Sequence, residues 1–252
     1  MKPLIIANWK MNPQTLVEAK KLFNLVKRGT RDVDNVGVVI CPPFVYLSNI
    51  QHLKSNIQVG AQDCFWEEKG AFTGEVSAPM LKNLGVKYVI VGHSERRRYF
   101  GETDEIINKK LKAALKAGLK PILCVGETEK ERKNNKTNQV IRRQLVRNLR
   151  GIENWKLKIE NLAIAYEPVW AIGTGNPCRV EDASRAFVFI QNVLAKIYNS
   201  KITARVRIIY GGSVNSQNAA GYIKKAKMHG LLVGGASLDP KEFVKIIKSC
   251  EV

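Results

Sequence analysis

Three residue types that together could move a proton stand far apart in this 252-residue sequence: Lys10, His93 and Glu167. A carboxylate can act as a general base, an imidazole can donate a hydrogen bond to a substrate oxygen, and an ammonium can stabilise the negative charge that develops there. This combination suits the removal of a proton from a carbon beside a carbonyl group. Taken singly, His93 could be a structural histidine, Glu167 could end a strand before Pro168, and Lys10 could be one of many surface lysines.

Two glycine-rich segments near the end of the chain predict a phosphate site. Gly211–Ser213 and Gly234–Gly235 follow the seventh and eighth of the apolar runs described below. Glycine lets the backbone approach an anion closely, and the loops after the last two strands of a β/α barrel often bind phosphate through backbone N–H groups. Alone, such pairs are more often tight turns; their shared position after consecutive strands favours phosphate binding instead.

Short apolar runs alternate with longer amphipathic segments along the whole chain. The clearest helical pattern is Val180–Asn199, where apolar residues recur three or four positions apart on one face. A repeated order of strand and helix predicts a parallel α/β architecture. The expected strands are Leu4–Lys10, Val36–Ile40, Gln58–Asp63, Tyr88–His93, Lys120–Gly126, Leu162–Glu167, Val206–Gly211 and Gly230–Gly234.

These strands could form either an open doubly wound sheet or a closed barrel. No Gly-x-Gly-x-x-Gly motif follows the first strand, which removes the main support for a dinucleotide-binding open sheet. Polar residues such as Asn8 and Lys10 stand at the carboxyl ends of strands, and in a barrel these ends converge on one mouth. We therefore favour one barrel domain over residues 1–252, close to the roughly 250 residues that such a fold needs.

The composition is that of an ordinary globular protein, with 45% hydrophobic and 25% charged residues. The first apolar run, Leu4–Ala7, is too short for a signal peptide or a membrane span, so we expect a cytoplasmic protein with no membrane partner. The five cysteines are an odd number without metal-ligand spacing. They predict reduced thiols rather than a disulfide framework or a zinc site.

The charge balance is unusual, because 41 Lys and Arg against 22 Asp and Glu give a net charge of +19. Such a charge could attract nucleic acid, an anionic membrane or acidic metabolites. The basic residues spread over many segments, with modest clusters at Lys130–Lys136, Arg142–Arg150 and Lys224–Lys227, and lack interleaved aromatic residues for base stacking. We interpret them as solvated helix faces and expect no nucleic-acid partner; a polyanion-binding protein is the alternative.

Five sequence blocks resemble the signatures of the triosephosphate isomerase family, in that family's order. They are Asn8-Trp9-Lys10-Met11-Asn12, Gly92-His93-Ser94-Glu95-Arg96-Arg97, Ala165-Tyr166-Glu167-Pro168-Val169-Trp170-Ala171-Ile172-Gly173-Thr174-Gly175, Tyr210-Gly211-Gly212-Ser213-Val214 and Leu232-Val233-Gly234-Gly235-Ala236-Ser237-Leu238. The resemblance implies an α/β fold, a single (β/α)8 TIM barrel. It also implies an isomerase of glycolysis and gluconeogenesis that interconverts D-glyceraldehyde 3-phosphate and dihydroxyacetone phosphate through an enediolate. A related barrel acting on another sugar phosphate is the alternative.

The resemblance also implies roles for single residues. Glu167 would be the catalytic base, and His93 a neutral hydrogen-bond donor, as is known for this family. Lys10 and Asn8 would stabilise the oxyanion and contact the substrate, Glu95 would orient Lys10, and no metal or organic cofactor is implied. The phosphate would bind the backbone N–H groups of four residues: Gly173, Ser213, Gly234 and Gly235.

The segment Pro168–Cys178 resembles the family's mobile lid, with Tyr210 and Ser213 as its latches. The far hinge departs from the family: Asn176-Pro177-Cys178 replaces the common Lys-Thr-Ala, and Arg179-Val180 replaces Thr-Pro. Proline fixes its own φ, and an arginine cannot supply the side-chain acceptor of a threonine N-cap. We expect altered lid kinetics with intact chemistry.

The segment Lys69–Val76 resembles the family's loop that inserts into a neighbouring subunit. This implies a homodimer in which Thr73 lies near Asn8–Met11 of the partner subunit and Glu75 near the partner's Arg96. A self-contained surface loop is the alternative.

Overall fold

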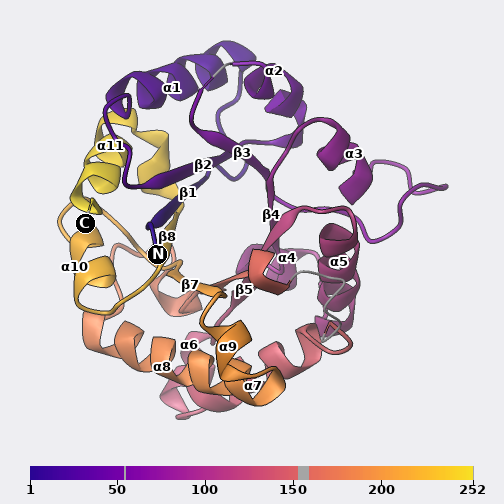
Figure 1. The fold of residues 1–252 in the computed structure, drawn as a ribbon, viewed down its shortest axis with the longest axis vertical. Coiled ribbons are helices and arrows are strands. Elements are labelled where there is room, and N and C mark those ends of the chain that lie inside the picture. The colour runs from indigo at the N-terminus through magenta and orange to yellow at the C-terminus, as the bar shows by residue number, and fades with distance from the viewer. Residues whose placement is uncertain (54, 153–158, 252) are drawn as a thin grey trace.

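Eight parallel strands close into a barrel inside a ring of helices in the computed structural model, which describes residues 1–53, 55–152 and 159–251 (Figure 1). Each strand pairs with the next one in sequence, and β8 pairs with β1, so that Leu4 lies opposite Gly230. The predicted barrel is confirmed. The strands are β1 (Leu4–Asn8), β2 (Gly37–Cys41), β3 (Gln58–Ala61), β4 (Tyr88–Val91), β5 (Lys120–Val125), β6 (Ala163–Tyr166), β7 (Arg207–Tyr210) and β8 (Gly230–Val233).

All eight strands lie where the sequence predicts them, but all except β2 end one or two residues earlier than expected. The residues wrongly included at the strand ends are largely the polar and glycine residues of the mouth, among them Lys10, His93 and Glu167. They leave the ladder because the backbone turns there toward the βα loops. Because the strands end earlier, these candidate site residues lie just beyond the carboxyl ends of the sheet.

The helices follow the strands around the outside of the barrel (Figure 1). The predicted helix Val180–Asn199 is confirmed, although it ends two residues early, at Ile197. The α-helices are α1 (Leu16–Gly29), α2 (Leu47–Gln51), α3 (Ala78–Asn83), α4 (Ser94–Tyr99), α5 (Asp104–Lys116), α6 (Glu129–Lys133), α7 (Thr137–Asn148), α8 (Val180–Ile197), α9 (Ser200–Thr203), α10 (Ala219–Lys224) and α11 (Pro240–Ser249). Single 3-10 turns are η1 (Phe44–Tyr46), η3 (Ile159–Asn161), η4 (Val169–Ala171) and η5 (Gly235–Leu238).

The strands are buried on both faces, which explains their nearly continuous apolar sequences. Alternate side chains fill the barrel interior, including Ile6, Ile90 and Ile122, while their neighbours, such as Ile5 and Val89, pack under the helices. All five cysteines are free and buried. Over the described parts of the chain, no helix is both long and apolar enough to cross a membrane.

His229, just before β8, makes stability depend on pH. Its Nδ1 accepts a hydrogen bond from the Ile208 N–H (3.1 Å), and burial, with help from Arg207 and the N-terminal amino group, lowers the pKa of His229 to about 4. The unfolded chain, with a histidine pKa near 6.5, therefore binds more protons between these pH values. The stabilisation is complete above pH 6.5 and is lost as the pH falls toward 4.

We expect His229→Gln to remove this pH dependence. Glutamine can still accept the hydrogen bond but does not titrate. Between pH 7 and pH 4.5 the wild type should lose about 1–2 kcal/mol more unfolding free energy than the variant, since partial exposure weakens the full effect. Urea unfolding at both pH values measures the difference, and parallel losses in the two proteins would contradict the expectation.

Candidate active site

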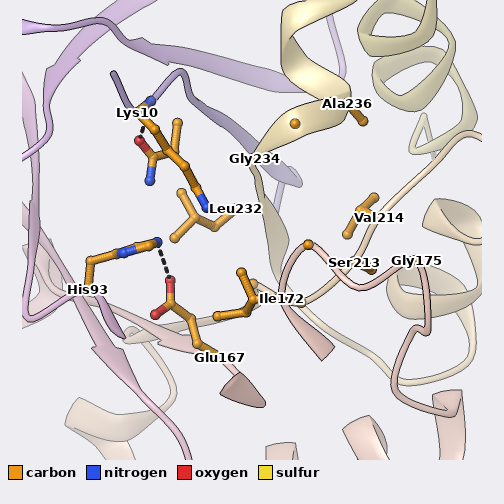
Figure 2. Close-up of a pocket in the computed structure, with 15 residues that line it drawn as sticks. Lys10, His93, Glu167, Ile172, Gly175, Ser213, Val214, Leu232, Gly234 and Ala236 are labelled. Atoms are coloured by element: carbon orange, nitrogen blue, oxygen red, sulfur yellow. Dashed lines mark hydrogen bonds and ion pairs between the residues drawn. The ribbon is translucent and has the colours of Figure 1, made fainter. Parts of the chain in front are cut away.

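A cavity of about 240 Å³ opens at the carboxyl ends of the strands. All eight residues predicted to contact substrate line it, whereas Glu95 and Tyr210 do not. Figure 2 shows Lys10, His93 and Glu167 pointing toward one another, with Gly234 beside Lys10 and Ser213 farther across the cavity. The lining consists of Asn8, Lys10, His93, Glu167, Ile172, Gly173, Gly175, Gly211, Gly212, Ser213, Val214, Leu232, Gly234, Gly235 and Ala236.

Glu167 directly follows β6 and is 2% exposed. Its Oε2 accepts a hydrogen bond from the Ser94 N–H (3.2 Å), and its Oε1 lies 3.3 Å from His93 Nε2. Two glycines make room for it. A Cβ at position 126 would lie 1.8 Å from the Glu167 carbonyl oxygen, and a Cβ at position 211 would lie 2.9 Å from its Cγ.

His93 presents an N–H group to the cavity as a neutral side chain. Its Nδ1 accepts a hydrogen bond from the Glu95 backbone N–H at the start of α4 (3.2 Å). A ring nitrogen that accepts carries no proton, so the single proton of the neutral imidazole is on Nε2, the atom that faces Glu167. The ring can therefore donate to a substrate oxygen.

Lys10 is held in an uncommon backbone conformation, with φ of 54°. Such a conformation costs roughly 1–3 kcal/mol in a non-glycine residue and persists only where neighbours enforce it. Asn8 Oδ1 accepts the Lys10 N–H (3.1 Å), and the Gln62 side-chain amide donates to the carbonyls of Lys10 (2.8 Å) and Cys41 (2.9 Å). Lys10 Nζ lies 2.5 Å from Glu95 Oε1. Gln62, which no sequence pattern singles out, thus ties Lys10 to the end of β2.

The opposite wall of the cavity carries backbone donors. The N–H groups of Gly234 and Gly235 donate no hydrogen bond to any described residue, and both glycines line the cavity. The Ser213 N–H, by contrast, donates to the Ala171 carbonyl (3.1 Å), so it is occupied in this lid position. The prediction for Ser213 therefore requires this bond to exchange when a ligand binds.

The lid segment reaches the cavity with its tip. Ile172 and Gly173 line the cavity, and the far hinge is held where the Cys178 N–H donates to the Tyr210 hydroxyl (3.1 Å). The Tyr222 hydroxyl donates to the Cys178 carbonyl (2.5 Å), and the two tyrosine rings stack with centroids 3.9 Å apart. Tyr210 thus contacts the far hinge, and its role as a latch stays a prediction.

Gly211→Ala tests how precisely Glu167 must be placed. The new methyl group would lie 2.9 Å from Glu167 Cγ, so the carboxylate must shift by a few tenths of an ångström or more. We expect kcat to fall by about ten- to a hundredfold, because small displacements of a reacting group are costly. Steady-state kinetics measure this, with Gly221→Ala on α10 as the control. Unchanged kcat in Gly211→Ala would show that the contact is not needed.

The fold and the cavity define a β/α-barrel enzyme in which a carboxylate, an imidazole and an ammonium group meet in one cavity that is also lined by glycine backbone. In the portion of the chain that the structure covers, no three His, Cys, Asp or Glu side chains are arranged to hold a metal ion.

The chain belongs to the triosephosphate isomerase family, whose model, described as "Triosephosphate isomerase", matches residues 3–250. It is 48% identical over 251 residues to the triosephosphate isomerase of Aquifex aeolicus, covering 99% of this chain and 100% of that protein. It is 50% identical over 250 residues to that of Endomicrobium trichonymphae, covering 98% of both chains. With the relative from Carboxydothermus hydrogenoformans it shares 49% identity over 249 residues, again covering 98% of each.

Proposed function

We propose that this enzyme interconverts D-glyceraldehyde 3-phosphate and dihydroxyacetone phosphate, as in glycolysis and gluconeogenesis, with Glu167 as the base. The observation that carries the proposal is the meeting of Glu167, neutral His93 and Lys10 around one cavity, with Glu167 Oε1 3.3 Å from His93 Nε2. Family membership supplies the substrates. Barrels that act on other sugar phosphates need not combine these three groups with this lid sequence.

The reaction follows from the placement of these groups. The Glu167 carboxylate removes a proton from the carbon beside the carbonyl, and the electron pair moves to the carbonyl oxygen, giving an enediolate. His93 Nε2–H and the Lys10 ammonium stabilise that oxygen, with Asn8 as a further donor. Glu167 then returns the proton to the former carbonyl carbon, which yields the isomer.

The phosphate group would bind at the opposite wall, through backbone N–H groups of Gly173, Ser213, Gly234 and Gly235. These donors carry no net charge, and a non-reacting group bound there can drive lid closure at the reacting carbons. Closure excludes water and limits the loss of phosphate from the enediolate.

The direct test is an assay with purified protein. D-glyceraldehyde 3-phosphate is supplied, and the dihydroxyacetone phosphate formed is measured by coupled reduction. We expect rapid turnover, and none with D-ribose 5-phosphate. Absence of turnover by folded protein, or preference for the longer sugar phosphate, would overturn the proposal.

We infer also that the enzyme is a homodimer, with the β3–α3 loop inserted into the partner. Residues 67–75 are all exposed, and this loop projects from the barrel (Figure 1). Exposed apolar side chains follow each of the first four strands, which lie side by side around the barrel: Met11, Phe44, Val45, Phe72, Tyr99 and Phe100. A shared face of this kind favours association.

Thr73→Arg should weaken the dimer, because a long cation at the tip of an inserted loop has no solvated position. We expect the dissociation constant to rise at least about tenfold. Sedimentation velocity over a dilution series measures it, with Gln139→Arg on α7 as a control of equal charge. An unchanged or monomeric profile in all three proteins would contradict the inserted loop.

The cytoplasm is the compartment that we propose, since buried free thiols suit a reducing environment. We propose no nucleic-acid partner, because the basic residues occur on helices all around the barrel rather than in one groove.

A further inference from the structure

A series of contacts joins the two ends of the lid through Arg132 on α6. The Arg132 guanidinium carbon lies 4.0 Å from the ring centroid of Trp170, and Nη2 lies 3.1 Å from Asp182 Oδ2. Trp170 belongs to η4, next to the first hinge at Pro168. Asp182 lies in the first turn of α8, next to the second hinge. One side chain therefore contacts both ends of the mobile segment.

The first hinge is held by a buried acid. Trp170 Nε1 donates to Glu127 Oε1 (2.9 Å), and the Tyr166 hydroxyl lies 3.3 Å from both oxygens of this carboxylate. Glu127 is fully buried, and burial raises its pKa. Arg132 Nη1, 3.8 Å from Glu127 Oε1, supplies the nearest positive charge while its guanidinium covers the Trp170 ring. Two contacts thus fix Trp170: the hydrogen bond from Nε1 at the edge of its ring, and the Arg132 guanidinium against the face of the ring.

The second hinge is held differently from the family's pattern. Arg179 is the N-cap of α8 and provides no side-chain hydrogen bond to the helix. Asp182 instead accepts from Arg179 Nε (3.2 Å) and from Arg132 Nη2 (3.1 Å). Partial burial opposes its ionisation, but hydrogen bonds from Arg185, Arg132 and Arg179 outweigh that effect and hold its pKa below the usual value. A carboxylate in the first turn is also favoured by the helix dipole.

We propose that Arg132 and Asp182 form a brace that couples the two hinges, so that the lid closes over the substrate as one body. The inference rests on the proposed isomerase function. With the brace intact, neither Trp170 nor the start of α8 can move without breaking its contact with Arg132. The lid tip lines the cavity while the brace is formed, so the brace favours the covered site. Arg132 and Asp182 are positioning residues, since neither lines the cavity.

The effect of breaking the brace should depend on whether the substrate carries a phosphate group. Substrate phosphate uses closure to promote proton transfer and to retain the enediolate. A substrate without phosphate cannot hold the lid closed, so its rate of turnover should not depend on the brace. Breaking the brace therefore predicts slower isomerisation of the phosphorylated substrate and more inorganic phosphate released per turnover.

The test compares Arg132→Met, Asp182→Ala and the double variant with the wild type. Arg185→Met is the matched control, because Arg185 pairs with Asp182 but is 71% exposed and makes no ring contact with Trp170.

We expect kcat/KM for D-glyceraldehyde 3-phosphate to fall about five- to tenfold in each brace variant. Phosphate release per turnover should rise severalfold, and turnover of unphosphorylated D-glyceraldehyde should stay within about twofold. The double variant should be no worse than either single one, as residues of one unit are not additive.

Three outcomes would overturn the brace: additive losses, equal losses with both substrates, or a loss in Arg185→Met as large as in Arg132→Met. A fourth is recovery of Asp182→Ala on adding Arg179→Thr, which would mean that Asp182 only caps α8. Thermal unfolding of each variant separates these results from failure to fold. A wild type without isomerase activity would refute the proposed function itself, independently of any difference between variants.

Discussion

Glu167→Gln is expected to lower kcat about 10³–10⁴-fold while the barrel stays folded. Glutamine has the size of glutamate, so the contacts with Ser94 and with His93 can largely remain. What is lost is the carboxylate that accepts the substrate proton. Gly211 leaves space for this side chain, because a Cβ at that position would lie 2.9 Å from Glu167 Cγ.

The measurement is the coupled assay together with exchange of the substrate carbon-bound hydrogen in deuterium oxide. Both rates should fall together, because both need proton abstraction. Glu129→Gln, an exposed change on α6, serves as the control. Exchange at the wild-type rate in Glu167→Gln would assign the base to another residue.

Lys10→Met should lower kcat about 10²–10³-fold and also raise KM. One preorganised donor to a developing oxyanion contributes about 2.7–4 kcal/mol to catalysis. The change also leaves the Glu95 carboxylate, which lies 2.5 Å from Lys10 Nζ, without its cation. That negative charge would then stand beside an anionic substrate.

Lys224→Met is the control for Lys10→Met. This exposed lysine ends α10 and forms no ion pair with any described residue, so its loss lowers the net charge by the same amount away from the mouth. If the two variants lost the same activity, the contribution of Lys10 would be long-range attraction of the substrate rather than contact. Steady-state kinetics at low and high ionic strength would show this directly.

The fold could be predicted because its signals are local and repeated. Strands buried on both faces leave apolar runs, and the helix that became α8 shows one apolar stripe. The strand ends were less predictable, since Asn8 or His93 can continue a strand as readily as leave it until the neighbouring loop is known. The far-hinge departure was visible in the sequence, and Arg179 indeed makes no side-chain cap.

The site residues could be named from motifs, but their geometry could not. The proton position on His93 depends on the Glu95 N–H, and the conformation of Lys10 depends on Gln62, 52 positions away. The Arg132 contacts join α6, η4 and the start of α8, and no sequence pattern links the spacing of these three segments. The Ser213 N–H bond to Ala171 is likewise a property of one lid position.

The pairing of β1 with β8 bears on how the protein is made. Leu4 meets Gly230, so the first strand to leave the ribosome waits for the last strand to complete its pairing. During synthesis both β1 and the newest strand present open edges, which can pair with other chains. A chain cut before residue 230 would retain such an edge permanently. Expression yield and chaperone dependence should therefore respond to substitutions in β8 more strongly than its four residues would suggest.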